Sequence, residues 1–238
     1  MQNISYNGVV KLSTLNLQGF VNWSQHKPAV LEYFQNEQPD VIFFQEAVYL
    51  PEVSIYNQVQ ELNQDLHYLF EHSNVTRLQV GKDYPVFREG LAVLSKYPVV
   101  KSDAIILKQA AGDEHNRIIQ MVDLFVDGSI VKFANIHFSL MEIADFATPH
   151  LQETLEIIAS RGEKRIIAGD FNISDLQSTA HLWQDHYTAS TTTPYVSFPA
   201  DNKTIDYILI PNEYAFESVT ATPNALTDHC AVTAVITL

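Results

Sequence analysis

Two kinds of apolar pattern alternate along this chain. Residues 41–44 form a continuous apolar run, which is typical of a strand covered on both faces. In residues 26–37, by contrast, Val30, Leu31 and Phe34 recur at helical spacing. Strands and helices that alternate in this way indicate an α/β fold.

The same criteria predict elements along the whole sequence. We expect strands at residues 9–16, 41–44, 91–95, 99–107, 118–126, 130–136, 166–168, 207–210, 216–222 and 231–236. We expect helices at residues 26–37, 52–66, 149–160 and 175–184, a hairpin of edge strands at 67–79, and a polar loop at 81–88. Asp127-Gly128 between two apolar runs is a strong hairpin signal, so some of the strand pairing must be antiparallel.

Polar side chains stand where the predicted strands end or begin. Strand ends carry Asn16, Glu46, His137, Asp170 and Asn172, and strand starts carry Glu89, Asp206, Asp228 and His229. In an all-parallel sheet these two groups would lie at opposite edges. If the strands of the second group run antiparallel to those of the first, all nine residues lie at one edge. The sequence therefore predicts a mixed sheet with five carboxylates, two amides and two imidazoles at one rim.

Such a cluster predicts a bound cation. Five unpaired carboxylates in one cleft would repel one another and raise their pKa values, which a cation relieves. The donors are hard oxygens without cysteine, which favours Mg²⁺ or Mn²⁺ over structural zinc. Plainer alternatives are that Asp170 and Asn172 are ordinary turn residues, and that His137 and His229 are hydrogen-bonded core histidines.

Composition and charge limit the partners. The 238 residues are 46% hydrophobic without a composition break, so we expect one domain over residues 1–238. No apolar run reaches the roughly 20 residues of a membrane span. The N-terminus lacks the pattern of a secretory signal, and Cys230 is the single cysteine, so we expect a cytoplasmic protein. The net charge of −14 disfavours nucleic acid, although residues 77–117 carry seven basic and five acidic side chains, a local +2 that suits one or two phosphates.

Seven short motifs then occur in a specific order. They are Leu15-Asn16 with Gly19, Pro39-Asp-Val-Ile-Phe-Phe-Gln-Glu46, Glu89-Gly-Leu-Ala-Val-Leu-Ser95, Ile136-His137, Gly169-Asp-Phe-Asn172, Ile205-Asp206-Tyr207 and Thr227-Asp-His229. This set resembles the endonuclease/exonuclease/phosphatase superfamily, which includes pancreatic-type deoxyribonucleases, abasic-site nucleases, neutral sphingomyelinases and inositol-polyphosphate phosphatases. The resemblance implies a four-layer sandwich of two packed mixed β-sheets flanked by helices.

The resemblance also implies roles for individual residues. Glu46 would be the principal Mg²⁺ ligand, supported by Asn16, with Asp228 and Asp170 near the metal. Asp170 and Asn172 would hold or activate the attacking water, and His229, paired with Asp206, would act as base or as a hydrogen-bond donor that orients the phosphate. His137, oriented by Glu89, would contact the phosphate or assist the leaving group, and Arg117 and Asn172 are further candidates for phosphate binding. Whether Asp170 or His229 is the general base stays open.

These roles predict a Mg²⁺-dependent phosphoesterase that cleaves a phosphodiester by in-line attack of water. The first expectation for the substrate is a nucleic acid or a nucleotide-like phosphodiester. A sphingomyelinase-like or inositol-phosphate activity is the alternative, followed by a non-catalytic binding protein, and no protein partner is predictable. Four aromatic residues could stack on a base but are commoner in cores, namely Trp183, Tyr187, Tyr195 and Phe198. The other histidines are expected at the surface, and His115 deserves notice because Arg117 is two residues away.

Overall fold

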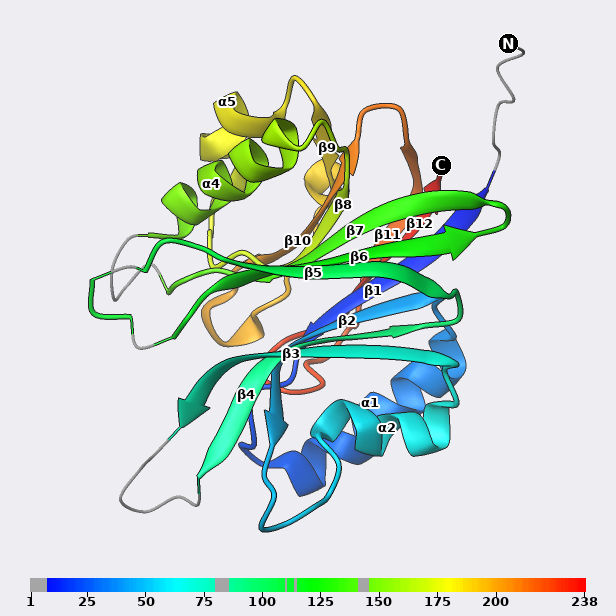
Figure 1. The fold of residues 1–238 in the computed structure, drawn as a ribbon, viewed down its shortest axis with the longest axis vertical. Coiled ribbons are helices and arrows are strands. Elements are labelled where there is room, and N and C mark those ends of the chain that lie inside the picture. The colour runs from blue at the N-terminus through cyan, green and yellow to red at the C-terminus, as the bar shows by residue number, and fades with distance from the viewer. Residues whose placement is uncertain (1–7, 80–85, 110, 114, 141–145) are drawn as a thin grey trace.

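Two β-sheets pack face to face in the computed structural model, which describes residues 8–79, 86–109, 111–113, 115–140 and 146–238 (Figure 1). The first sheet has the strand order β11 (Ala215–Ala221), β12 (Val232–Thr237), β1 (Val9–Asn16), β2 (Val41–Tyr49), β4 (Phe87–Ser95) and β3 (Phe70–Gln79). The second has the order β5 (Val99–Ile106), β6 (Ile118–Val126), β7 (Ser129–His137), β8 (Ile166–Asp170), β10 (Asp206–Pro211) and β9 (Tyr187–Ala189). Both sheets are mixed, because β1–β2 and β7–β8 are parallel and the other pairs are antiparallel.

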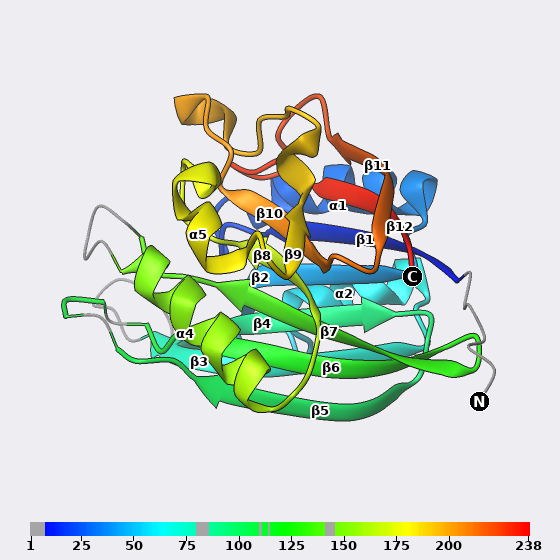
Figure 2. The ribbon, with the colours of Figure 1, turned by 90° about the horizontal axis from the view of Figure 1, so that it is seen from above.

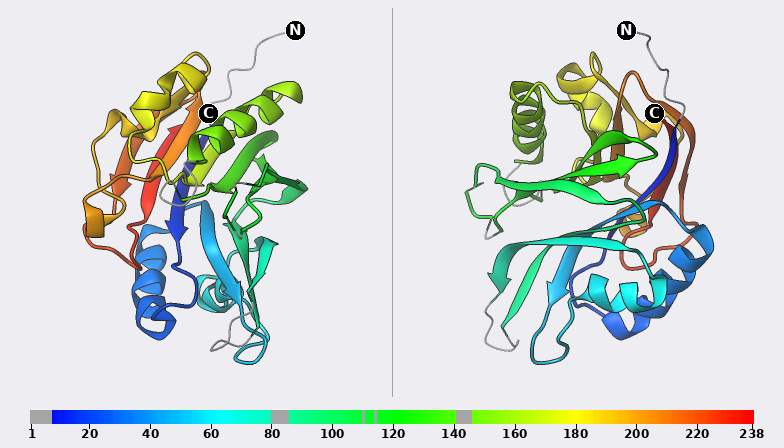
Figure 3. Two further views of the ribbon diagram at one scale, coloured as in Figure 1. Left: turned by 90° about the vertical axis from the view of Figure 1, so that its left-hand side faces the viewer. Right: turned by 45° about the vertical axis from the view of Figure 1, so that its right-hand side comes forward.

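Helices cover the outer face of each sheet. Helices α1 (Trp23–Glu37) and α2 (Gln58–Leu66) lie on the first sheet, and α4 (Ala147–Ser160) and α5 (Ala180–Trp183) lie on the second (Figures 2 and 3). Short 3₁₀ turns at Leu176–Thr179, Ser190–Thr192 and Pro199–Asp201 complete the second half. The described chain is therefore the predicted four-layer sandwich. None of its helices combines the length and apolar character needed to cross a membrane.

The alternation of side chains along β2 explains its continuous apolar run. Val41 and Phe43 belong to the core between the two sheets, whereas Ile42 and Phe44 belong to the core beneath α1 and α2. All four side chains are buried. A strand with a packed layer on each side has no face left for water, so no polar residue interrupts it.

Two predictions for the first half of the chain were wrong. Residues 67–79 are not a hairpin, because the single strand β3 pairs along its length with β4. Helix α2 begins at Gln58 rather than near residue 52, because Asn57 and Gln60 form a reciprocal capping box there. Most of the polar loop expected at 81–88 lies outside the described residues.

A buried polar clamp joins the two sheets. Gln45 Nε2 donates to Asn135 Oδ1 at 2.7 Å, which links β2 to β7. Asn135 Nδ2 is 3.0 Å from Gln120 Oε1 and 3.2 Å from both the Phe44 and Ala92 carbonyl oxygens. Gln45, Gln120 and Asn135 have no exposed surface. Because a buried polar group without a partner is costly, this clamp fixes how one sheet sits on the other.

We therefore expect Asn135→Ala to lower the free energy of unfolding by about 3 kcal/mol, since it strips partners from both glutamines. Chemical unfolding followed by circular dichroism measures the change. Gln64→Ala on the exposed face of α2 is the control and should stay within about 0.5 kcal/mol of the parent. Equal stabilities for the two variants would contradict the clamp.

Candidate active site

Three of the sequence-predicted residues form a row across the second sheet. Asp170 ends β8, and the strand register places His137 of β7 on one side of it and Asp206 of β10 on the other. Gly169 precedes this row with a φ of 143°, and a Cβ there would lie 2.0 Å from the Ile136 carbonyl oxygen. Glycine is therefore required at this contact between β8 and β7.

Residues from the other sheet converge on the same carboxylate. Asp170 Oδ2 is 3.0 Å from Asn16 Nδ2, 3.6 Å from His137 Nε2 and 4.0 Å from His229 Nε2. Asn16 ends β1 and His229 precedes β12, so both come from the first sheet. Asp170 and the three side chains around it are buried. One carboxylate oxygen is thus surrounded by an amide and two imidazoles from three separate segments.

Glu46 reaches this centre from a bulge and not from a strand end. The strand β2 continues to Tyr49, and its pairing with β4 shifts register between Phe44 and Ala47. Glu46 has a φ of 52°, which turns its side chain out of the regular alternation. Its Oε1 lies 3.2 Å from Asn16 Nδ2 and 3.8 Å from His137 Nε2. The prediction that Glu46 ends the strand was therefore wrong, although Glu46 does lie at the predicted rim.

His229 is held by a buried carboxylate. Its Nδ1 lies 2.8 Å from Asp206 Oδ2, and its Nε2 is 3.8 Å from Asp228 Oδ1. Ser197 supports Asp206, because its hydroxyl accepts the backbone N–H groups of Ile205 and Asp206 at 3.0 Å each. These contacts fix the ring so that Nε2 points toward Asp170.

Asn172 lies just beyond the end of β8. Its backbone N–H donates to Asp170 Oδ1 at 2.9 Å, and its Nδ2 donates to the Phe138 carbonyl oxygen at 2.9 Å. The φ of 51° is left-handed, so Asn172 does not continue the extended chain from which the sequence argument started. It still lines the same cavity as Asp170.

Glu89 and Arg117 both line a small pocket next to His137, and each has a partner of its own. Glu89 contacts Arg77 Nη2 at 3.0 Å and His115 Nδ1 at 3.6 Å. Arg117 Nε donates to Asp113 Oδ2 at 2.8 Å, and the same oxygen accepts the Ser139 hydroxyl. The contacts of His137 Nε2 go to Glu46 and Asp170, so the described ion pairs connect Glu89 to His115 and not to His137.

Most of the predicted site residues line one cavity of about 540 Å³, whereas Glu89 and Asp206 are not part of its lining. Its lining includes Asn16, Glu46, His115, Arg117, His137, Asp170, Asn172, Phe198, Lys203, Asp228 and His229. Residues 13–229 match the endonuclease/exonuclease/phosphatase family. The chain belongs to that family. Members of the endonuclease/exonuclease/phosphatase family are metal-dependent hydrolases that act on phosphoester bonds.

Solved structures show the same fold at low sequence identity. A family member from Leptotrichia buccalis has a TM-score of 0.77 at 18% identity, with 94% of this chain and 98% of that chain covered. The human Nocturnin catalytic domain with bound sulfate anion has a TM-score of 0.72 at 18% identity, covering 98% and 96%. Sphingomyelinase C from Streptomyces griseocarneus has a TM-score of 0.68 at 16% identity, covering 96% and 99%. No curated protein matches the sequence.

Two carboxyl groups of this site have pKa values above their usual range. Burial, and then the charge of Glu89, raise the pKa of Glu46 to about 7. Burial, and then the charge of Asp206, raise the pKa of Asp170 to about 7. Both groups therefore resist ionisation when no cation is near, as expected for acidic side chains crowded together and shielded from water.

The two imidazoles differ in charge. Burial alone would lower the pKa of His229, but Asp206 and then Asp170 and Asp228 raise it to about 10. Burial, and then the positive charge of Arg117, hold the pKa of His137 well below its usual range. At neutral pH His229 is thus an imidazolium that donates from both nitrogens, whereas His137 is neutral.

The donor set fits a divalent cation. Half-buried Glu46 and buried Asp170 are carboxylates on either side of the Asn16 amide, and the Asp228 Oδ1 atom is buried without a hydrogen-bond partner among the described residues. Hard, mutually repelling oxygens of this kind are the ligands that Mg²⁺ takes. Asn16 presents Nδ2 to both carboxylates while its Oδ1 accepts the Gln18 N–H at 2.9 Å, so coordination by that oxygen between the carboxylates requires the amide to turn over.

Several contributors to the site were not found in the sequence. Asp113 and Ser197 form no motif and act through backbone and side-chain contacts that only the fold creates. Of the four aromatic candidates, Trp183 and Tyr187 are buried in the core, and the Tyr195 hydroxyl bonds to the Asp206 carbonyl oxygen. Phe198 lines the cavity and packs edge-on against His229, with ring centroids 5.1 Å apart.

The surface position expected for His150 was wrong. His150 lies in α4 with its ring buried, with Nε2 2.8 Å from the Lys108 carbonyl oxygen and Nδ1 3.4 Å from the Ser139 nitrogen. Burial lowers its pKa, so it is a neutral histidine satisfied on both nitrogens. His150 belongs to the scaffold behind Ser139 and Asp113.

Proposed function

We propose that this protein is a Mg²⁺- or Mn²⁺-dependent phosphodiesterase that cleaves its substrate by in-line attack of water. The observation that carries the proposal is the convergence on Asp170 Oδ2 of Asn16, His137 and His229, with Glu46 alongside. A bound divalent cation would stabilise the charge that develops on the phosphoryl oxygens and the leaving group. The nearby carboxylates and imidazoles would supply the proton transfers.

The charges support a division of roles. Once a cation has displaced its own proton, Asp170 is placed to accept a proton from the attacking water, and Asn172 orients it through its backbone N–H. His229 is already protonated, so it is suited to donate a hydrogen bond to a phosphoryl oxygen while Asp206 holds its ring. These observations favour Asp170 over His229 as the general base.

Glu46 and Asp228 would hold the cation, with Asp170 beside it and Asn16 in support. Asp170, Asp206 and His229 form a second possible donor set, because one ligand atom of each lies within 4.8 Å of the others. His229 Nδ1 is engaged by Asp206 at 2.8 Å, however, so the Glu46 side of Asp170 is the better position. Neutral His137 and the terminal nitrogens of Arg117 would contact the substrate phosphate, with Glu89 behind them as an indirect support.

The cavity suits a compact phosphodiester. Its two permanently cationic side chains, Arg117 and Lys203, are each paired with an aspartate at 2.8 and 2.9 Å. A long nucleic acid would need a longer row of cations against the net charge of −14. We therefore keep a nucleotide-like phosphodiester, the substrate class expected from the sequence, and a headgroup phosphodiester is the alternative substrate.

A single catalytic domain over residues 1–238 and a cytoplasmic location remain predictions.

A substrate panel tests the proposal. Bis(p-nitrophenyl) phosphate, an abasic duplex, single strands, sphingomyelin and inositol phosphates should be incubated with Mg²⁺, with Mn²⁺ and with EDTA. We expect turnover of at least the first compound, lost in EDTA and restored by either metal. Turnover that is indifferent to chelation would contradict metal dependence. Tight Mg²⁺ binding without hydrolysis of any compound would instead establish the non-catalytic alternative.

A further inference from the structure

Asp113 is a buried carboxylate to which the proposed reaction gives no role. It lies between β5 and β6, and its side chain is 3% exposed. Its Oδ2 accepts the Arg117 Nε–H at 2.8 Å and also the Ser139 hydroxyl. Its Oδ1 accepts the backbone N–H of His115 at 2.9 Å. A buried carboxylate with three donors is part of a fixed hydrogen-bond network and not a mobile surface charge.

The network continues from Asp113 to helix α4. The Ser139 N–H donates to His150 Nδ1 at 3.4 Å, and His150 Nε2 is 2.8 Å from the Lys108 carbonyl oxygen. Glu153, also on α4, accepts the Lys108 N–H at 3.0 Å. Ser139 and His150 have no exposed surface. Helix α4 therefore supports both the residue behind Asp113 and the start of the segment that ends at Arg117.

Arg117 is held at one nitrogen and open at the other two. Its Nε is bound to Asp113, and among the described residues no hydrogen bond engages Nη1 or Nη2. The side chain lines the active-site cavity together with His137. A guanidinium is planar, so one fixed nitrogen sets the direction of the whole group. Its remaining N–H groups can then meet two phosphate oxygens at once.

The charge of Asp113 separates orientation from simple attraction. Burial alone would raise the pKa of Asp113, but Arg117, and then Ser139 and the His115 N–H, lower it to about 2. Asp113 is therefore anionic at any pH suited to an assay, and it offsets the positive charge of Arg117. If charge alone mattered, Asp113 would weaken phosphate binding. If orientation matters, Asp113 strengthens it, so the two explanations predict opposite effects of its removal.

We propose that Asp113 is a positioning residue that orients the Arg117 guanidinium toward the substrate phosphate, with Ser139 and His150 as its support. This inference rests on the proposed phosphodiesterase function. The guanidinium adopts its binding orientation before the substrate arrives, so less conformational entropy is lost on binding. The phosphoryl oxygens are charged before the reaction as well as during it. The gain therefore falls on substrate binding and appears in KM.

Steady-state kinetics with bis(p-nitrophenyl) phosphate and Mg²⁺ tests the sign of the effect. We expect Asp113→Ala to raise KM about tenfold, with kcat within about threefold of the parent. Asp113→Asn restores an acceptor oxygen without the charge and should bring KM back to about threefold above the parent. In the Arg117→Ala background Asp113→Ala should add little, because the two residues act as one unit. Ser139→Ala, expected to raise KM about threefold, and Asp113→Asn keep the test if Asp113→Ala does not fold.

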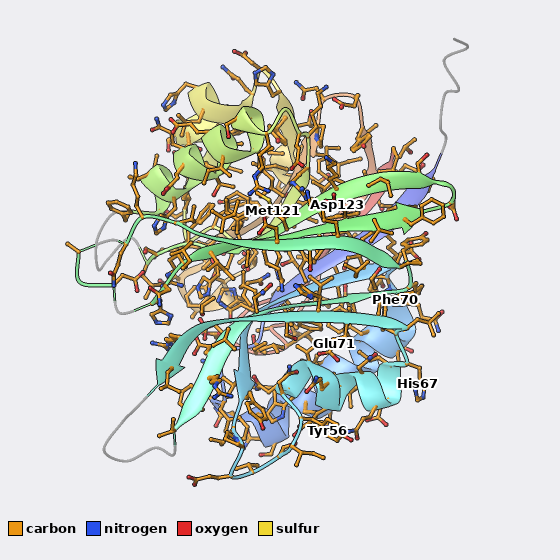
Figure 4. The ribbon with its side chains drawn as sticks, viewed as in Figure 1. Tyr56, His67, Phe70, Glu71, Met121 and Asp123 are labelled. Atoms are coloured by element: carbon orange, nitrogen blue, oxygen red, sulfur yellow. The ribbon has the colours of Figure 1, made fainter. Side chains whose placement is uncertain are left out.

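A second aspartate–arginine pair provides the matched control. Arg161 Nη2 lies 2.8 Å from Asp103 Oδ2, and Arg161 Nη1 contacts Met121 Sδ at 3.7 Å. Met121 belongs to the core between the second sheet and α4 (Figure 4). Neither Asp103 nor Arg161 is part of the cavity lining. Asp103→Ala should therefore keep the parental kcat and KM.

Hydrogen exchange at the Arg117 Nε–H measures the orientation without any turnover. Isotope-labelled protein is studied by nuclear magnetic resonance in EDTA, and the signal is identified by its absence from Arg117→Lys. We expect exchange with solvent to be at least about tenfold faster in Asp113→Ala and unchanged in Asp103→Ala.

The outcomes separate this inference from the proposed function. A KM that is unchanged or lower in Asp113→Ala would overturn the inference, and so would an equal increase in Asp103→Ala. Unchanged exchange at the Arg117 Nε–H in Asp113→Ala would overturn it as well. A parent protein that hydrolyses no diester would refute the proposed function alone, because the exchange measurement still decides whether Asp113 holds Arg117.

Discussion

His229→Gln is expected to lower kcat for bis(p-nitrophenyl) phosphate by about 10³-fold. Glutamine cannot carry the positive charge that Asp206, Asp170 and Asp228 stabilise on the imidazole. The variant therefore loses the hydrogen-bond donor that faces the phosphate. Steady-state kinetics with saturating Mg²⁺ measures the loss, and thermal unfolding shows that the fold is retained. His181→Gln, at an exposed position of α5, is the matched control and should keep parental kcat.

Asp206→Asn tests the same His229–Asp206 pair by changing the carboxylate. It removes the charge 2.8 Å from His229 Nδ1 and should lower the pKa of His229 as well as kcat. The double variant should be little worse than His229→Gln alone, because the two residues act as one unit. Fully additive losses, or more than a tenth of parental activity in either single variant, would show that the pair has no joint role.

Mg²⁺ should raise the unfolding temperature more at pH 8 than at pH 5.5. Glu46 and Asp170 have pKa values of about 7, so both are largely protonated at the lower pH and must lose their protons before a cation binds. The stabilisation is therefore absent well below pH 7 and develops as the pH rises through it. At a Mg²⁺ concentration of about 100 times Kd the stabilisation is about 2.7 kcal/mol.

Glu46→Gln should abolish most of this stabilisation and lower kcat by at least about 10²-fold. Without metal, the same variant should be as stable as the parent or more stable at pH 8, because it removes a charge that burial and Glu89 disfavour. Glu52→Gln, in the exposed loop after β2, serves as control and should behave like the parent. A Mg²⁺ effect that is equal at both pH values, or one that survives in Glu46→Gln, would place the cation elsewhere.

Where packing alone decides the backbone, the sequence predicts it well. The hairpin at Asp127-Gly128 joins β6 and β7 as expected, and the run from Val41 to Phe44 is a strand between two cores. Positions that depend on local hydrogen bonding were harder to predict from the sequence. The capping box at Asn57 starts α2 later than its apolar pattern implies, and the bulge at Glu46 has no signature in sequence spacing.

The active site also contains residues that the sequence reveals and residues that it does not. Residues that carry chemistry occur in recognisable order, and the structure gathers Asn16, Glu46, His137, Asp170 and His229 around one cavity. Their supports depend on contacts between distant segments, which a single sequence does not encode visibly. Asp113 holds Arg117, and Ser197 holds the backbone of Asp206, across turns whose shape comes from the fold. Glu89 in turn contacts His115, a neighbour that motif order did not indicate.

The clamp between Gln45 and Asn135 has a consequence for how the molecule tolerates change. Gln45 directly precedes Glu46, and Asn135 is two residues before His137, so the bond that fastens one sheet to the other lies directly behind two groups of the reaction centre. Slippage of the sandwich by even a fraction of a strand spacing would pull these groups apart while each half kept its own core. Weakening of this clamp should therefore abolish activity before it unfolds the protein.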